Sequence, residues 1–246
     1  MPAQRKRKQT KDSRKALKWI LRASLKLALA GILVTVFQVM ALRFINPPFT
    51  AGMAWHWLKG QLGSNKYEQP AYHWRSLEDM SPSLIRAVLA GEDQRFFSHN
   101  GFDFIELDHA LREILTSGKT RGASTVTMQT ARTVFLWPGR SWLRKSAEAY
   151  YTIFLELLWD KKRILEVYLN TVDWGEGIVG AEAAARRYFL RRSDQVTPFQ
   201  AASLAAILPS PHRWSPTKPN QTVRNRTHRI LKDMRHIPLS FMDEGT

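Results

Sequence analysis

Residues 81–103 read SPSLIRAVLAGEDQRFFSHNGFD, and this stretch predicts the class of fold. Ser81 suits the capping position of a helix, and Pro82 follows at the first helical position, where proline is well tolerated. Apolar residues then recur at helical spacing, so one face of this helix is apolar. The helix is expected to end near two adjacent carboxylates, Glu92 and Asp93, followed by a turn rich in aromatic residues. The stretch therefore predicts an amphipathic helix that presents acidic groups at its end.

The same pattern of caps and apolar stripes continues along the rest of the chain. Strand-like alternation is scarce, and no repeat of 20–50 residues is visible. The sequence therefore predicts a mainly α domain. Further helices are expected near residues 104–117, 124–136, 141–159, 161–170, 178–190, 197–207 and 221–234.

Length and composition limit the possible classes of protein. The chain has 246 residues, of which 44% are hydrophobic, enough for one core domain and an anchor. It contains no cysteine, which excludes disulfides, cysteine-ligated zinc and thiol chemistry. Its net charge is +16, so anionic lipid headgroups, phosphates or nucleic acid are the partners to consider. Nucleic acid is disfavoured, because the basic tail has no interleaved aromatic residues and lies beside an apolar segment.

An uncharged segment near the amino terminus predicts a membrane anchor. Residues 27–42 read LALAGILVTVFQVMAL, and the flanking residues extend the expected span to 20–45, long enough for a bilayer. A cleaved signal peptide is the alternative, but its cleavage sequence, ALA at 28–30, would lie inside the apolar run. The first 26 residues carry ten basic side chains and one Asp. This bias predicts a basic cytoplasmic tail, residues 1–19, with the rest of the chain outside.

The segment after the anchor is expected to connect it to the folded domain. The sequence NPP at 46–48 stops the anchor helix, because proline disfavours a helical residue before it. We expect a linker and entry segment at 46–74 and the domain at 75–240.

The adjacent carboxylates Glu92 and Asp93 are the first candidates for chemistry. A carboxylate against aromatic walls has a raised pKa because of desolvation, which suits a general base or acid near neutrality. The alternative for an isolated acidic pair is a solvated helix end.

A second block, RGASTVTMQTARTVFLWPGR at 121–140, combines hydroxyl, amide and cationic side chains. Small hydroxyl residues near a helix start, followed by arginine, can hold phosphate oxygens. The alternative is a capped, amphipathic surface helix. The candidate residues of this block are Ser124, Thr125, Thr127, Gln129, Arg132 and Arg140.

A third block, RKSAE at 144–148, places Glu148 one helical turn beyond Arg144 and Lys145. Two surface salt bridges of little energetic value are the alternative. Two cations so close favour the ionised carboxylate, and thus an orienting or metal-holding role. A fourth block at 161–189 is mostly scaffold: an apolar stripe from Ile164 to Leu169 and a small-residue segment from Gly180, with Lys161 as a candidate ligand contact.

Together these blocks resemble the biosynthetic peptidoglycan glycosyltransferases, also called glycosyltransferase family 51. The family patterns are E-D-x-x-F-x-x-H-x-G, G-x-S-T-x-T-Q-Q-x-x-K-N, R-K-x-x-E and K-x-x-I-L-x-x-Y-L-N. Here they read EDQRFFSHNG, GASTVTMQTART, RKSAE and KKRILEVYLN, in the same order and spacing. The later LPSPHRWSP at 208–216 is similar to the closing segment of the family. The resemblance covers about residues 75–220, and no transpeptidase pattern follows, so the monofunctional form matches best.

The resemblance implies a lysozyme-like, helical fold with a long groove. It implies that Glu92 is the general base and Glu148 the second catalytic carboxylate, which assists departure of the donor diphosphate. Three residues depart from the family pattern, Met128, Arg132 and Thr133; the arginine keeps the charge, whereas the other two remove amides. The residues expected to contact the substrate are Asp93, Ser124, Thr125, Gln129, Arg132, Arg140, Arg144 and Lys145.

The resemblance also implies the reaction, the compartment and the partners. The expected activity joins lipid II to a lipid-linked glycan chain with inversion, forming a β-1,4 bond and releasing polyprenyl diphosphate. No cofactor is obligatory, although Mg²⁺ or Mn²⁺ at the diphosphate stays open. The expected place is the bacterial inner membrane, single-pass, with the catalytic domain in the periplasm, and other cell-wall synthesis and division proteins stay open as partners. Two alternatives remain: a membrane-anchored scaffold without enzymatic activity, and a hydrolase resembling lytic transglycosylases.

Overall fold

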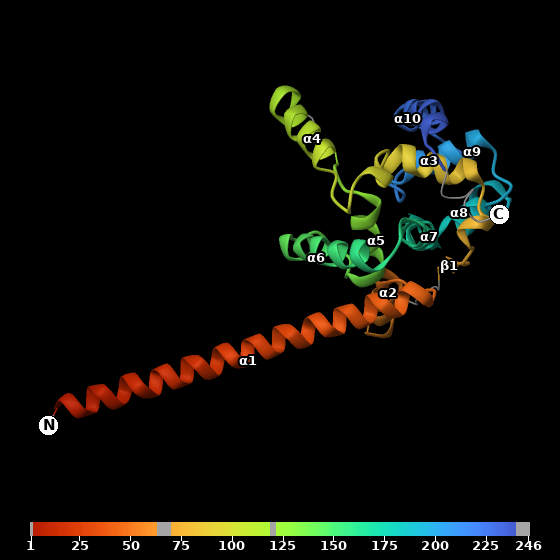
Figure 1. The fold of residues 1–246 in the computed structure, drawn as a ribbon. Coiled ribbons are helices and arrows are strands. Elements are labelled where there is room, and N and C mark those ends of the chain that lie inside the picture. Colours follow the sequence, from red (N-terminus) through yellow and green to blue (C-terminus); the bar gives the residue numbers. More distant parts are fainter. Residues whose placement is uncertain (1, 63–69, 119–121, 240–246) are drawn as a thin grey trace. The chain divides into compact units, whose positions relative to one another are not determined.

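The computed structural model of the chain describes residues 2–62, 70–118 and 122–239 (Figure 1). The chain divides into two compact units, residues 1–44 and 45–246. Met1, residues 63–69 of the predicted linker and Ser240 at the end of the predicted domain lie outside the described residues.

The first unit is one long helix, α1, from Pro2 to Phe44. Within it, Lys18–Phe44 is long and apolar enough to cross a membrane, which fits the predicted anchor at 20–45. At a rise of about 1.5 Å per residue, such a segment exceeds the roughly 30 Å thickness of the hydrocarbon layer.

The second unit begins with residues that the sequence predicted as a linker. They form the helix α2, Ala51–Leu62, and the short strand β1, Ala71–Tyr72. The hydroxyl of Tyr72 donates to the backbone oxygen of Pro47 at 2.6 Å, which closes the entry segment. This segment is therefore part of the folded unit.

The body of the second unit is helical, as predicted. Its centre is α7, whose apolar stripe is fully buried: Ile164, Leu165, Tyr168 and Leu169 have no exposed surface. Helices α3, α9 and α10 pack against one another, and α5 packs against both α6 and α7, whereas α4 stands out from the body in Figure 1. The helices are α3 Pro82–Glu92, α4 Phe104–Ser117, α5 Val126–Phe135, α6 Trp142–Leu158, α7 Lys161–Thr171, α8 Ala181–Phe189, α9 Pro198–Ile207 and α10 Gln221–Asp233, with the single-turn 3₁₀ helices η1 Leu77–Asp79, η2 Phe96–Ser98 and η3 Met234–His236.

Local capping chemistry fixes the helix ends. The carboxylate of Asp103 accepts hydrogen bonds from two backbone N–H groups at the start of α4, and Gly118 ends that helix with φ +67°. Thr197 and Gln200 form a reciprocal capping box at the start of α9. Such caps satisfy backbone groups that a helix leaves unpaired at its ends.

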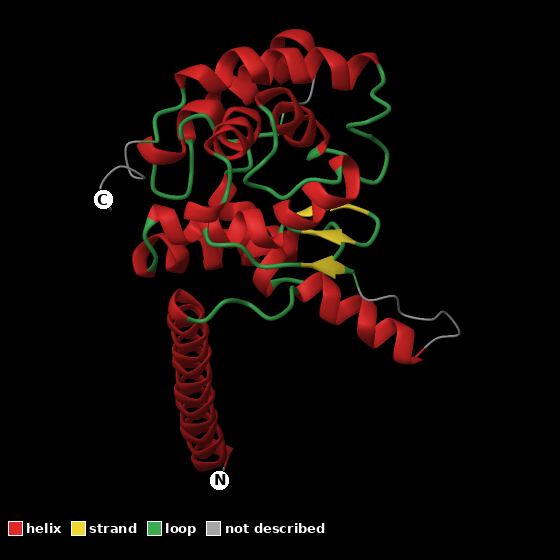
Figure 2. Cartoon of the chain, turned by 90° about the vertical axis from the view of Figure 1, so that its right-hand side faces the viewer, coloured by secondary structure: helices red, strands yellow, loops and turns green. Residues whose placement is uncertain are grey.

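A three-stranded sheet in the order β1-β3-β2 lies at one side of the helical body (Figure 2). Strand β2 covers Asp173–Gly175 and strand β3 covers Ile178–Val179; β3 pairs parallel with β1 and antiparallel with β2. The prediction that a helix begins at residue 178 is therefore wrong, because α8 begins only at Ala181.

Glycine explains how α8 approaches α7 so closely. Gly180 has φ +86°, and a Cβ atom there would lie 2.6 Å from the backbone oxygen of Asn170. Any other residue would meet both a strained backbone conformation and a clash. The close packing predicted from Gly180 and the following alanines is confirmed.

Candidate active site

Glu92 lies at the last position of α3, with 11% of its side chain exposed. Both carboxylate oxygens are engaged: Oε2 accepts from Gln129 Nε2 at 2.9 Å, and Oε1 accepts from Arg226 Nη2 at 2.9 Å. Burial raises the pKa of Glu92, while the Arg226 and Arg132 charges and the Gln129 hydrogen bond oppose that shift. A carboxylate with a raised pKa is suited to accept a proton near neutral pH.

Gln129 connects Glu92 to two further elements. Its Oε1 accepts hydrogen bonds from the Tyr168 hydroxyl at 3.3 Å and from Arg132 Nη2 at 3.4 Å. Burial raises the pKa of Tyr168 well above 10, so its hydroxyl stays protonated and acts as a donor. Helices α3, α5 and α7 therefore meet in one hydrogen-bond network around Glu92.

Sequence reasoning did not identify Arg226. It lies on α10, 134 residues beyond Glu92, and its Nη2 also donates to the backbone oxygen of Gly91 at 2.7 Å. The approach is close, because a Cβ atom at Gly91 would lie 3.1 Å from Ile230 of the same helix. No local motif predicts this contact, because α10 carries many basic residues on its exposed face and Arg226 cannot be distinguished from them in the sequence.

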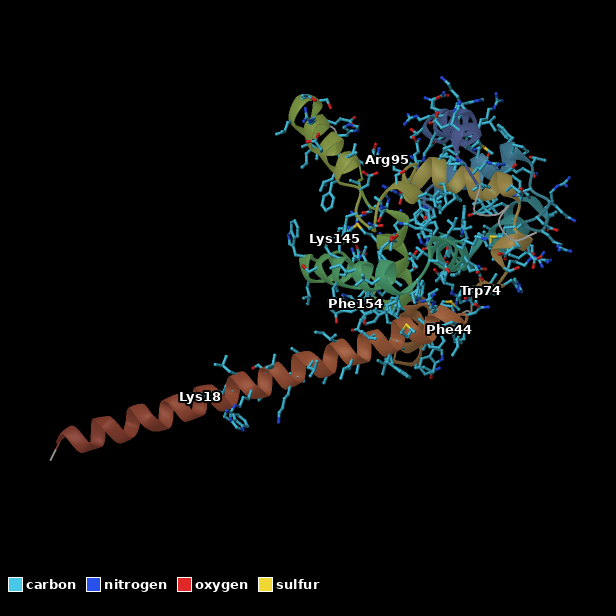
Figure 3. The ribbon with its side chains drawn as sticks, viewed as in Figure 1. Lys18, Phe44, Trp74, Arg95, Lys145 and Phe154 are labelled. Carbon is cyan, nitrogen blue, oxygen red and sulfur yellow. The ribbon has the colours of Figure 1, made fainter. Side chains whose placement is uncertain are left out.

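Glu148 lies on α6 with 2% of its side chain exposed. Arg144 Nη1 pairs with Oε1, and Lys145 Nζ donates to Oε2 at 3.0 Å. Lys145, labelled in Figure 3, also donates to the Ser124 hydroxyl at 3.2 Å. The structure thus brings the second and third sequence blocks together, and the side chain of Glu148 lies between two cations.

Three of the four predicted cations line a groove of about 1900 Å³, whereas Lys145 does not. Arg132, Arg140 and Arg144 lie along it, and Arg132 and Arg144 also belong to the networks of Glu92 and Glu148. Other walls come from α2, the turn between β2 and β3, and His212, whose ring pairs with Asp173 at 2.7 Å. A groove with three arginines is chemically suited to an anion that carries several oxygen acceptors, such as a diphosphate.

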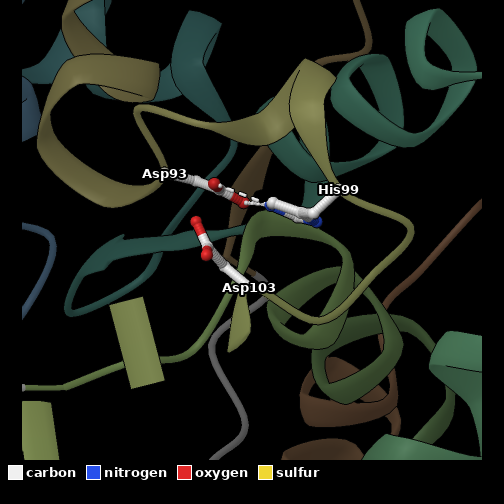
Figure 4. Close-up of side chains that lie close together, drawn as sticks. All are labelled: Asp93, His99 and Asp103. Carbon is white, nitrogen blue, oxygen red and sulfur yellow. Dashed lines mark hydrogen bonds and ion pairs between the residues drawn. The ribbon is translucent and has the colours of Figure 1, made fainter. Parts of the chain in front are cut away.

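Asp93 lies beside Glu92 but turns into the protein. One carboxylate oxygen lies 3.0 Å from His99 Nε2, and the other accepts from the backbone N–H of Val126 at 2.9 Å. Figure 4 shows the facing side chains of Asp93 and His99, with Asp103 beside them. Asp93 thus fixes the turn after α3 to the start of α5.

Two possible metal sites can be compared with the residues present. Among the described residues, Asp93, His99 and Asp103 form a group that could hold a metal ion. Their carboxylates already accept backbone hydrogen bonds, and Asp103 also pairs with Arg95 at 3.1 Å. Both oxygens of Glu148 face a cation. A divalent cation at either group would therefore share the carboxylate oxygens with these contacts.

Two other predicted contact residues are engaged within the protein. Thr125 caps α5, and its hydroxyl donates to the backbone oxygen of Gly101 at 2.6 Å. Lys161 donates to the backbone oxygen of His99 at 2.7 Å and to Glu156 at 2.9 Å, and it lies over the Phe96 ring. Both residues hold the turn that follows Glu92.

Met128 and Thr133, which stand where the family pattern has amide side chains, lie on different sides of α5. Met128 is buried, with 8% exposed surface. Thr133 lines the groove and its hydroxyl lies 3.0 Å from that of Thr171. Of the two departures, only Thr133 therefore changes the wall of the groove.

Comparison with known proteins identifies the family of the chain. Residues 59–235 match the model of a family described as Transglycosylase. The match covers well over half of the chain, so the chain belongs to the transglycosylase family and is a glycosyltransferase.

Several similar proteins carry the name biosynthetic peptidoglycan transglycosylase. One from Xanthomonas campestris pv. campestris (strain B100) is 43% identical over 229 residues, covering 92% of this chain and 90% of the relative. Relatives from Caulobacter vibrioides and Pseudomonas aeruginosa are 46% and 44% identical, covering 85% and 89% of this chain and 89% and 94% of their own lengths.

Proposed function

We propose that this protein is a peptidoglycan glycosyltransferase that polymerises lipid II into linear glycan strands. The observation that carries the proposal is the groove itself, in which three arginines lie next to two networks that each hold a buried carboxylate. The names of the relatives support the substrate class, and the geometry supports the roles that we propose for the residues.

In the proposed reaction, Glu92 accepts the proton of the acceptor sugar 4-hydroxyl. That oxygen attacks the anomeric carbon of the donor opposite the α-linked diphosphate, so a β-1,4 bond forms with inversion. The carbon–oxygen bond to the diphosphate breaks, and polyprenyl diphosphate leaves with the electron pair. Arg132, Arg140 and Arg144 face the negative charge that grows on this leaving group.

Glu148 has an orienting role in this scheme. Its carboxylate fixes the Arg144 guanidinium and the Lys145 ammonium, which are thereby held next to Ser124 and the groove. Preorganised cations stabilise developing charge without having to reorganise during the reaction. No step needs a metal ion.

Incubation with lipid II in vesicles tests the proposal directly. The wild type and the Glu78→Gln control, at an exposed position, should form polymer and release polyprenyl diphosphate. Glu92→Gln should lower kcat by at least about 10², the usual scale of general-base loss. Cleavage of preformed glycan without diphosphate release would identify a hydrolase, and absence of either reaction would favour a scaffold.

The proposed place of the protein is the bacterial inner membrane, with the catalytic unit in the periplasm. Support comes from the apolar segment Lys18–Phe44 and the ten basic residues within the first 26. A reporter that works only outside the cytoplasm should be active when it is fused after Thr246. Activity of a reporter that works only in the cytoplasm would contradict this topology.

A further inference from the structure

A pocket that the proposed reaction does not use adjoins the groove at the turn between β2 and β3. Its volume is about 390 Å³, within the size range of small-molecule sites. Glu176 and Ile178 line both the pocket and the groove. A ligand that lies in the groove can therefore extend a side branch into the pocket.

Three separate segments of the chain build this pocket. Gly175 of β2 has φ +143°, and a Cβ atom there would lie 2.7 Å from the hydroxyl of Tyr188, so glycine lets α8 approach β2 closely. The Tyr188 hydroxyl donates to the backbone oxygen of Trp174 at 3.0 Å. The third wall is a turn in which the backbone N–H of Lys218 donates to the Ser215 hydroxyl at 3.2 Å. Contacts within the protein therefore hold the walls of the pocket in place.

The pocket presents charges of both signs. Arg187 and Lys218 are exposed cations that line it, and Glu176 is an exposed acid. In the described part of the chain, no ion pair involves any of these three, whereas the neighbouring Arg186 pairs with Glu182. Charges that the protein does not neutralise are available to a ligand. The pocket thus suits a ligand that carries carboxylates together with N–H groups.

A peptide attached to the sugar has this chemistry and reaches this place. Peptidoglycan is a glycan that carries short peptides, so a lipid-linked precursor brings a peptide with a free terminal carboxylate on the sugar beside its diphosphate. In the proposed reaction, the diphosphate lies along Arg132 and Arg140 in the groove that shares a wall with the pocket.

We propose that this pocket binds the peptide of the lipid-linked substrate, with Arg187 and Lys218 facing its carboxylates. The assignment rests on the proposed function, because it names a second part of the same substrate. It gives the groove two recognition points, one for the diphosphate and one for the peptide.

Binding of the peptide alone tests the assignment without any turnover. The probe is the soluble precursor peptide, labelled with a fluorophore at the end that the sugar normally occupies and titrated against the full chain in detergent. The matched probe is the same peptide with every carboxylate amidated. The variant is Arg187→Ala/Lys218→Ala. Its control, Arg191→Ala/Lys232→Ala, removes the same two residue types from exposed positions that do not line the pocket.

The wild type should bind the carboxylate peptide at least about threefold more tightly than the amidated peptide, and Arg187→Ala/Lys218→Ala should bind it about fivefold more weakly than the control, as expected for two exposed ion pairs. Absence of saturable binding, or equal affinity of the variant and the control, would overturn the assignment. Complete displacement by an equal concentration of inorganic diphosphate would also overturn it, because the peptide would then occupy a phosphate site.

Kinetics separate this assignment from the proposed function. With lipid II, Arg187→Ala/Lys218→Ala should have a KM about fivefold above that of the control at unchanged kcat, because contacts to a side branch stabilise the ground state and the transition state equally. With a lipid-linked disaccharide that lacks the peptide, the two should have equal KM. A wild type that polymerises neither substrate would contradict the proposed function and leave the binding result valid. A variant with the KM of the control for lipid II would contradict the role of the pocket.

Discussion

The side-chain amide of Gln129 donates to Glu92 at 2.9 Å and accepts, through its other end, from Tyr168 and Arg132. An amide that is held by two donors can present only its NH₂ group to the carboxylate. Gln129 thereby favours the ionised form of Glu92, although burial disfavours it. The balance between these effects sets the pH at which a base at this position works.

The pH dependence of the wild type should show this balance. A general base must be ionised before it accepts a proton, and burial raises the pKa of Glu92. As pH falls through that raised pKa, kcat should fall, so the acidic limb should lie above the ordinary range of a glutamate. Polymerisation rates between pH 4 and 8 measure it. A rate that stays constant down to about pH 4 would contradict the assignment of Glu92 as the base.

Replacing Arg226 should move the acidic limb of the pH profile of kcat further toward higher pH. Arg226→Gln removes a positive charge that lowers the pKa of Glu92, while Arg132, Tyr168 and Asp93 remain nearby. Because Glu92 is then ionised only at higher pH, kcat on the acidic side of the profile should fall about severalfold, and the rate at higher pH should change less.

The control is Arg229→Gln, on the exposed side of the same helix. It should keep both the rate and the pH profile of the wild type. If Arg226→Gln lowered only the melting temperature and left the acidic limb in place, Arg226 would be a structural residue and not one that positions the base.

Stability in acid should depend on Glu182, whose side chain contacts no residue that lines the groove. Burial opposes ionisation of Glu182, but hydrogen bonds from Ser193 and the charge of Arg186 outweigh it and lower the pKa. The contribution to stability is therefore present above the unfolded pKa of about 4.3 and is lost as pH falls through the lower, folded pKa.

Glu182→Gln keeps one acceptor oxygen but removes the charge and the second acceptor, so it should reduce the free energy of unfolding at pH 7 by about 1–3 kcal/mol. The difference from the wild type should shrink toward pH 3. Urea denaturation at both pH values checks this, and a gap that is equal at pH 7 and pH 3 would show that ionisation of Glu182 contributes nothing.

Local sequence signals predicted most helices but not the entry segment. Helix α4 matched its predicted bounds because Asp103 and Gly118 give chemically explicit ends. Helix α2 was missed, because the prolines before it and the glycines within it weaken the local signal. Residues 178–179 continue an apolar pattern into α8, yet they pair as a strand because β1 and β2 lie alongside.

The two candidate carboxylates, Glu92 and Glu148, could be selected from the sequence because each lies within a compact motif. Their partners divide into two groups. Arg144 and Lys145 lie within one helical turn of Glu148, so helical spacing alone places them together. Arg226 reaches Glu92 only through the packing of α10 against α3, and no local pattern contains that information.

The arginines of the groove should matter for turnover and not for folding. Arg140 is exposed and Arg132 is partly exposed, so their contribution to stability is small. In a diphosphate site, each faces charge that grows as the bond breaks. Arg132→Ala and Arg140→Ala should each lower kcat about 10², with a melting temperature close to that of the wild type. Arg132→Lys, which restores the family residue, should keep much of the activity, and Arg191→Ala at an exposed position should change nothing.

The same two arginines should hold an inhibitor that resembles the donor. Moenomycin carries a phosphate between a lipid and a sugar, and the resemblance to the family implies that it occupies the donor site. A charge-assisted hydrogen bond to phosphate is strong and bidentate for arginine, so each alanine variant should bind moenomycin at least about tenfold more weakly. Titration in detergent measures the affinity without any turnover. Because Arg191→Ala removes the same charge from a distant surface, it shows how much of any loss comes from net charge alone. Equal affinity in the wild type and in both groove variants would show that these arginines form only a charged surface.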